Sequence, residues 1–142
     1  MSYLLEYIDE IESGRIVVGR ELKTVLESLK SDLSNPDYVY DERPGQLRID
    51  FIEKFCRHTK SPFNGMPFKL ELWEKAFLEA SYGFKMAGTG FRRFNEVLLL
   101  IARKNGKTTF VAAIDLAEFF LSSGGVDIIC ASNTNEQASI LF

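Results

Sequence analysis

Few residues of this chain are suited to binding metals or forming disulfides. The 142 residues contain two cysteines, Cys56 and Cys130, which are far apart, and one histidine, His58. A zinc ribbon, a dense disulfide framework and a multi-histidine metal centre are therefore excluded, and a Ser-His-Asp triad would have to use His58. We interpret His58 as an ordinary residue at a helix end. The cysteine usage favours a reducing, cytoplasmic environment.

Long hydrophobic runs and a charge excess of one sign are also lacking. The longest apolar run, Val97–Ala102, is too short to cross a bilayer, and residues 1–9 do not read as a signal peptide. Seventeen basic and 20 acidic residues give a net charge of −3, so overall charge would not hold the chain to nucleic acid. The length fits one domain or part of a larger one. We expect any phosphate group to be bound locally.

The first two thirds of the chain show helical patterns. Apolar spacing predicts helices over 3–11, 22–33, from Pro44 to 55, and 70–82, with a turn-rich loop over 59–69. The apolar positions expected to face the core are Leu22, Val25, Leu26, Leu29 and Leu33 in the second helix, Leu47, Phe51 and Phe55 in the third, and Trp73, Phe77 and Ala80 in the fourth. Residues 84–94 read as a turn or hairpin.

The pattern changes after residue 94. Val97–Ala102 is continuously apolar, as expected for a strand buried in a parallel sheet. A helix over 107–121 and a second strand over 126–131 would complete a βαβ unit, and Thr134 with Gln137 reads as a capping box opening another helix. We therefore predict an α/β fold: a mainly helical part over 1–94, followed over 95–142 by the beginning of an incomplete parallel sheet.

The segment between this strand and its helix carries the chemistry. Gly106-Lys107-Thr108 is the end of a P-loop signature, and the predicted sheet is accordingly of the P-loop NTPase kind. Amides of the loop and of the first helical turn would hold phosphate oxygens, Lys107 would reach the β- and γ-phosphates, and Thr108 would ligate Mg²⁺. Ile101 stands where the first glycine of the standard pattern would be, so a purely structural turn remains the alternative.

Local charge agrees with an anion site. From residue 90 to 109 there are five basic residues against Glu96 alone. The five are Arg92, Arg93, Arg103, Lys104 and Lys107. From residue 110 onward no basic residue occurs, which favours an anion site at the loop over general solvation.

The residues from Ala102 to Thr109 resemble the deviant P-loop of tailed-phage terminase large subunits, the ATPases that package double-stranded DNA into procapsids. Other segments are similar to the N-terminal region of that family in kind and order. These segments are Ser13-Gly14-Arg15, Asp41-Glu42, Leu70–Glu74 and Thr89–Phe94. The resemblance spans nearly the whole chain and implies ATP and Mg²⁺ as cofactors.

The resemblance also implies roles for individual residues. Lys107 resembles the phosphate-binding lysine, Thr108 the Mg²⁺ ligand, and Arg103 a catalytic arginine finger acting in cis; a plain phosphate or surface contact is the alternative for Arg103. Trp73 resembles an adenine-side aromatic, although core packing would explain it equally well. The cofactor-binding set implied is Ala102, Arg103, Lys104, Asn105, Gly106, Lys107, Thr108, Thr109 and Trp73.

Two functional hypotheses from different classes follow. The first is an N-terminal piece of a packaging ATPase, whose full-length form is implied to act as a ring on the portal with the small terminase subunit and double-stranded DNA. Hydrolysis needs an acidic pair after a later strand; the chain lacks it, so we expect the piece alone to be inactive. The second is a non-catalytic assembly module in which helices over 3–55 dock a portal or small-subunit protein. A metabolic P-loop kinase fits less well, because Arg103-Lys104-Asn105 is not glycine-rich.

Overall fold

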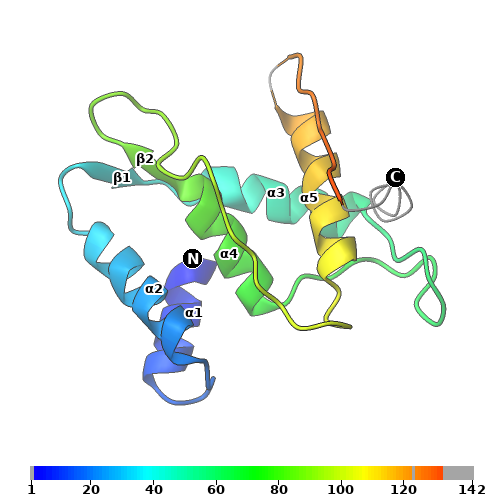
Figure 1. Ribbon diagram of the computed structural model, residues 1–142, viewed down its shortest axis with the longest axis horizontal. Coiled ribbons are helices and arrows are strands. Elements are labelled where there is room, and N and C mark those ends of the chain that lie inside the picture. Colours follow the sequence, from blue (N-terminus) through cyan, green and yellow to red (C-terminus); the bar gives the residue numbers. More distant parts are fainter. Residues whose placement is uncertain (1, 123, 133–142) are drawn as a thin grey trace. The chain divides into compact units, whose positions relative to one another are not determined.

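The computed structural model describes residues 2–122 and 124–132 (Figure 1). The helices are α1 (Tyr3–Glu12), α2 (Arg20–Asp32), α3 (Arg43–Phe55), α4 (Leu72–Gly83) and α5 (Lys107–Leu121), and the strands are β1 (Tyr38–Tyr40) and β2 (Phe84–Met86). The elements belong to two compact units. Unit 1 comprises Met1–Ile49 with Leu70–Val97, and unit 2 comprises Asp50–Lys69 with Leu98–Phe142, within the described residues.

Unit 1 is built around the packing of α1 on α4. Helix α1 begins where the Ser2 hydroxyl accepts a hydrogen bond from the Leu5 amide, and it ends before Gly14, whose φ of 77° is a left-handed conformation. Strands β1 and β2 pair antiparallel, with Val39 opposite Lys85. The core of the unit consists of Leu4, Tyr7 and Ile8 from α1, Leu26 and Leu29 from α2, Ala76 from α4 and Phe84 from β2.

A buried carboxylate ties the elements of unit 1 together. Glu79 on α4 is fully buried, and its carboxylate accepts hydrogen bonds from the Ser2 hydroxyl (2.7 Å), the Leu4 amide (2.9 Å) and the Tyr40 hydroxyl (3.1 Å). Burial raises the pKa of Tyr40, which keeps its hydroxyl protonated as a donor. At Gly45 the backbone passes so close to α4 that a Cβ would lie 2.6 Å from the Glu79 Cα. The carboxylate thus joins the start of α1, β1 and α4.

Unit 2 contains the second half of α3, a long loop and α5. Ile52 on α3 is fully buried, and so are Phe110 and Ala117 on α5. The rings of Phe51 and Phe120 stack with centroids 5.8 Å apart, which brings the two helices together. The loop between α3 and α4 is closed by an antiparallel bridge between Arg57 and Pro67.

The helix predictions from the sequence are confirmed, and α5 covers the predicted residues 107–121. The predicted core faces are confirmed in part: Leu26 and Leu29 are buried, and Leu33, Trp73 and Ala80 pack against the core of unit 1. The prediction is wrong for Leu22, Val25, Leu47 and Phe55, which are 39%, 53%, 52% and 61% exposed. In α3 the buried residues are Ile49 and Ile52, and in α4 they include Ala76 and Leu78, whereas Trp73, Phe77 and Ala80 are only half-buried. The apolar stripes are wide enough for neighbouring helices to contact a rotated face.

The prediction of a βαβ unit is not confirmed for the described residues. Neither Val97–Ala102 nor residues 126–131 form a strand, and Leu98, Leu100 and Ile129 are 82%, 84% and 86% exposed. The predicted burial of these segments is therefore wrong for this chain. A strand exists only where neighbouring strands accept and donate its backbone hydrogen bonds, and continuous apolarity does not supply such neighbours. The only sheet in the described residues is the antiparallel pair β1–β2, so the chain is α/β in the coarse sense of helices with a small sheet.

Three other predictions can be compared. The turn over residues 84–94 is confirmed: the Met86 amide donates to the Phe91 carbonyl, and Lys85 bridges to Arg92. Residues 50–69 group with unit 2, so the compact units differ from the division at residues 94 and 95, which stays a prediction. The capping box at Thr134 lies outside the described residues.

Within residues 2–122 and 124–132, no helix has the length and apolar character needed to cross a membrane.

Candidate nucleotide-binding site

The backbone of the predicted phosphate-binding loop has two left-handed residues before α5. Gly106, the N-cap residue of α5, has a φ of 74°, and Lys104 has a φ of 69°, the only positive value outside glycine in the described chain. Loops that reverse handedness in this way turn successive amides toward one side and create an anion-binding concavity. A Cβ on Gly106 would meet nothing within 4 Å, so the need for glycine here is conformational.

Helix α5 starts directly after this turn. The Phe110 amide donates to the Gly106 carbonyl (3.0 Å), which is the first bond of the helical ladder. The amides of Lys107, Thr108 and Thr109 precede the ladder and have no acceptor within the helix. No side chain of Gly106 can cap them, and the positive end of the helix dipole lies at the same point. These amides are therefore suited to donating hydrogen bonds to an anion.

The site has a rigid base and an exposed rim. Phe110, Ala113 and Ala117 are buried and anchor α5, whereas every residue from Ala102 to Thr109 is exposed. The side chains of Arg103, Lys104, Asn105, Lys107 and Thr108 consequently lie at the surface, on a turn fixed by the buried face of the helix. The structure thus places Ala102–Gly106 in the turn and Lys107–Thr109 at the start of α5, and their roles toward a nucleotide stay predictions.

Two of the basic residues counted around the loop, Arg92 and Arg93, have partners within unit 1. Arg93 forms an ion pair with Asp32, and its guanidinium lies 4.1 Å from the centroid of the Tyr38 ring. The Arg92 guanidinium lies 5.3 Å from the centroid of the Tyr82 ring. Both arginines belong to unit 1 and are engaged there. The charges carried by the loop itself are those of Arg103, Lys104 and Lys107, and none is paired with a carboxylate of the described residues.

Trp73, predicted as either an adenine contact or a core residue, lies on α4 in unit 1. Its ring is half-buried and packs against the hydrophobic core of that unit. Core packing therefore accounts for part of its surface. Contact with a base stays a prediction, because the loop belongs to unit 2.

The carboxylates near the loop are not arranged as a metal site. Asp115 lies in the middle of α5; burial raises its pKa, and the Cys130 thiol lies 3.9 Å from its Oδ2. Asp127 is exposed. In the described part of the chain, no group of three histidine, cysteine or acidic residues could hold a metal ion.

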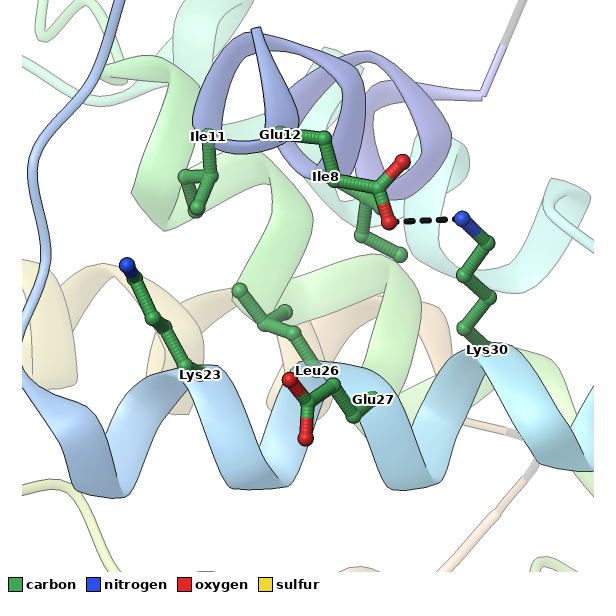
Figure 2. A pocket seen from close by; sticks show the side chains of 7 residues that line it. All are labelled: Ile8, Ile11, Glu12, Lys23, Leu26, Glu27 and Lys30. Atoms are coloured by element: carbon green, nitrogen blue, oxygen red, sulfur yellow. Dashed lines mark hydrogen bonds and ion pairs between the residues drawn. The ribbon is translucent and has the colours of Figure 1, made fainter. Parts of the chain in front are cut away.

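The structure shows one feature of the loop that sequence reasoning missed, the left-handed Lys104. A short polar run ending in Asn-Gly is the signal that would have predicted a reversal of handedness there. A shallow groove in unit 1 was also not anticipated (Figure 2). It measures about 220 Å³, lies between α1 and α2 over Ile8, Ile11 and Leu26, and is crossed at one end by the ion pair between Lys30 and Glu12 (2.6 Å). It contains none of the predicted site residues.

A lysine-threonine pair opening a helix after a left-handed glycine is typical of P-loop ATPases. A family model described as terminase large subunit, ATPase domain, matches residues 72–142. The chain belongs to this family, which confirms the resemblance found in the sequence. It is 36% identical over 100 residues to the terminase large subunit of Enterobacteria phage HK97, a match that covers 69% of this chain. The chain spans about a fifth of the length of that relative, since 19% of the relative is covered. No solved structure matches the chain.

Proposed function

We propose that residues 102–109 bind the triphosphate of ATP and that the chain is the N-terminal part of the ATPase of a phage DNA-packaging motor. The observation that supports the proposal is the left-handed backbone at Lys104 and Gly106, which stands directly before the uncapped, exposed start of α5 that carries Lys107. Lys107 contributes an ammonium group to the β- and γ-phosphates, and the Thr108 hydroxyl contributes a ligand to Mg²⁺.

Arg103 has a different role in this proposal. Its exposed guanidinium, four residues before Lys107, stabilises the charge that develops on the γ-phosphoryl group during transfer. The terminase family supports the wider setting: a full-length protein that forms a ring on the portal, works with the small terminase subunit and moves double-stranded DNA. Those partners and the ring belong to the proposal for the longer protein. Binding of ATP is the part of the proposal that can be tested with this chain.

The first experiment measures binding of a nonhydrolysable ATP analogue with Mg²⁺ by calorimetry. A charge-assisted contact contributes roughly 1.5–3 kcal/mol, so Lys107→Ala should weaken binding by about tenfold to a hundredfold. Lys60→Ala, which removes an exposed lysine of the same unit outside the loop, is the matched control and should bind as the unchanged chain does. Equal binding by all three proteins would refute the role of Lys107, and no binding by any of them would favour the assembly-module hypothesis, in which the loop is a structural turn.

The second experiment isolates the metal role of Thr108. Thr108→Ala should weaken binding of the analogue more in the presence of Mg²⁺ than in its absence, because only the metal-bound complex uses the hydroxyl. Thr108→Ser keeps that hydroxyl and should restore the Mg²⁺ dependence. Losses of the same size with and without Mg²⁺ would contradict a metal-ligand role.

A further inference from the structure

The loop between α3 and α4 carries the second concentration of positive charge in the chain. From residue 54 to 70 there are four basic residues, Lys54, Arg57, Lys60 and Lys69, and no acidic one, although the whole chain has a net charge of −3. All four basic side chains are exposed. Only Lys69 has an acidic partner in the described residues, Glu53 at 3.7 Å, and its side chain remains 71% exposed.

The loop has a defined shape. Backbone hydrogen bonds connect its two sides: the His58 amide donates to the Met66 carbonyl (3.0 Å), and the Phe68 amide donates to the Cys56 carbonyl (3.1 Å). The Gly65 amide donates to the His58 carbonyl (2.8 Å). At the base, the His58 ring packs edge-on against buried Phe68, with centroids 5.0 Å apart. These contacts at the base of the loop therefore define the position of its tip.

Two large apolar side chains lie at the tip, beside the charges. Phe63 is 55% exposed and Met66 is 53% exposed, and every residue from Ser61 to Pro67 is exposed. Arg57 uses its guanidinium partly to close the end of α3, donating to the carbonyls of Lys54 (2.9 Å) and Cys56 (2.8 Å). Its charge is thereby fixed at the base of the loop and stays at the surface. A structured loop that exposes both apolar side chains and cations matches a polyanion with apolar faces between its charges.

We propose that loop 56–69, together with Lys54, contacts the sugar–phosphate backbone of duplex DNA. The cations of Lys54, Arg57 and Lys60 face phosphates, and Phe63 and Met66 pack on deoxyribose. The observation behind this is charge complementarity: the cluster has the sign opposite to that of the whole chain, and contacts to phosphate carry the sequence-independent part of DNA binding. The choice of duplex DNA as the partner rests on the proposed function. The charge and the shape of the loop are observed independently of that function.

The experiment measures binding of a mixed-sequence DNA duplex to the 142-residue chain by fluorescence anisotropy over a range of salt concentrations. Binding is expected to be weak but measurable at low salt. Lys60→Ala should lower affinity about tenfold at about 50 mM salt and reduce the slope of log K against log salt by about 0.9, the loss of one phosphate contact. Phe63→Ser should lower affinity severalfold and leave the slope unchanged.

Matched controls lie in unit 1. Lys23→Ala removes an exposed lysine and gives the same net charge as Lys60→Ala, and Val17→Ser removes a 91% exposed apolar side chain. Neither should change DNA binding, and circular dichroism should show all four variants folded. No measurable binding at low salt, or equal losses for Lys60→Ala and Lys23→Ala, would overturn the proposal. Sedimentation with phosphatidylserine vesicles in the absence of DNA binding would overturn it in favour of a membrane surface.

The two proposals fail in different ways. Lys60→Ala should bind the ATP analogue normally and DNA poorly, whereas Lys107→Ala should bind the analogue poorly. A chain that binds DNA through the loop but no analogue would refute the nucleotide site alone. If the chain binds the analogue but all protein variants bind DNA equally, only the proposal that loop 56–69 contacts DNA would be refuted.

Discussion

The left-handed backbone at Gly106 leads to a prediction about a single residue. A residue with a Cβ costs roughly 1–2 kcal/mol in the left-handed conformation, so Gly106→Ala should destabilise the chain by about that amount although the added methyl meets nothing. Urea denaturation would measure it. Gly88 is the control: it also has open space around it but no positive φ, so Gly88→Ala should be neutral or slightly stabilising. Equal effects would show that the turn relaxes without its left-handed geometry.

Glu74 gives a prediction about pH. It is buried on α4, its Oε2 accepts a hydrogen bond from the Glu71 amide (2.8 Å), and burial raises its pKa. A carboxyl whose pKa is higher in the folded than in the unfolded chain binds more protons when folded, so its contribution to stability falls as pH rises through its ordinary pKa, about 4.3. Glu74→Gln keeps an acceptor and removes the charge. It should therefore gain in stability relative to the unchanged chain between pH 4 and pH 7.

Urea unfolding of both proteins at the two pH values would measure this gain. Glu27→Gln removes an exposed charge on α2 and serves as the control for net charge. A Glu74→Gln variant that loses stability relative to the unchanged chain as pH rises would contradict the inferred direction of the pKa shift.

At the scale of elements, α3 shows what the buried face of a helix contributes. Ile52 is fully buried and Phe55 is 61% exposed, although the apolar spacing predicted Phe55 in the core. Ile52→Ala should cost about 2–5 kcal/mol, because it leaves a cavity in a packed interior. Phe55→Ala should cost less, because its exposed ring loses only surface contacts, such as those with the Phe51 ring (5.2 Å between centroids) and the Lys54 ammonium (5.3 Å from the centroid). Unfolding midpoints in urea would compare the stability of the two variants. A larger loss for Phe55→Ala than for Ile52→Ala would indicate that the face predicted from the sequence is the buried one.

Features with local causes could be predicted from the sequence, and features with long-range causes could not. The limits of α5 could be predicted because Gly106 before it and Ser122 after it act within a few residues. The buried faces of the helices were harder to predict. The face of α3 that is buried depends on which elements from elsewhere in the chain pack against it. Strand β1 was missed: its residues Tyr38–Tyr40 are strand only through pairing with β2, more than 40 residues later.

The candidate site shows the same division. Gly106, Lys107 and Thr108 could be found from the sequence, because a P-loop is a contiguous motif whose physics is that of one turn and one helix end. The partners of the upstream arginines could not, because they are distant in the sequence. Arg93 pairs with Asp32, a residue 61 positions away. A loop was predicted over 59–69, but its backbone pairing and the packing of His58 on Phe68 required the structure.

At the scale of the whole molecule, the described chain exposes apolar side chains that a parallel sheet would bury. Leu98 and Leu100 are 82% and 84% exposed on a segment with no strand partner. Because burial supplies the stabilising energy of such side chains, these two contribute little to the folded state of this chain. They also leave an apolar surface that favours self-association.

Replacing both with lysine separates these two effects. Leu98→Lys combined with Leu100→Lys should leave the free energy of unfolding within about 0.5 kcal/mol, as is usual for surface substitutions, and should lower self-association at high protein concentration. Urea denaturation and sedimentation velocity would measure the two quantities. The matched control is Leu4→Lys, which places a charge in the core of unit 1 and should unfold it. A marked loss of stability in the double variant would instead show that the segment is packed in solution, as a strand of a sheet would be.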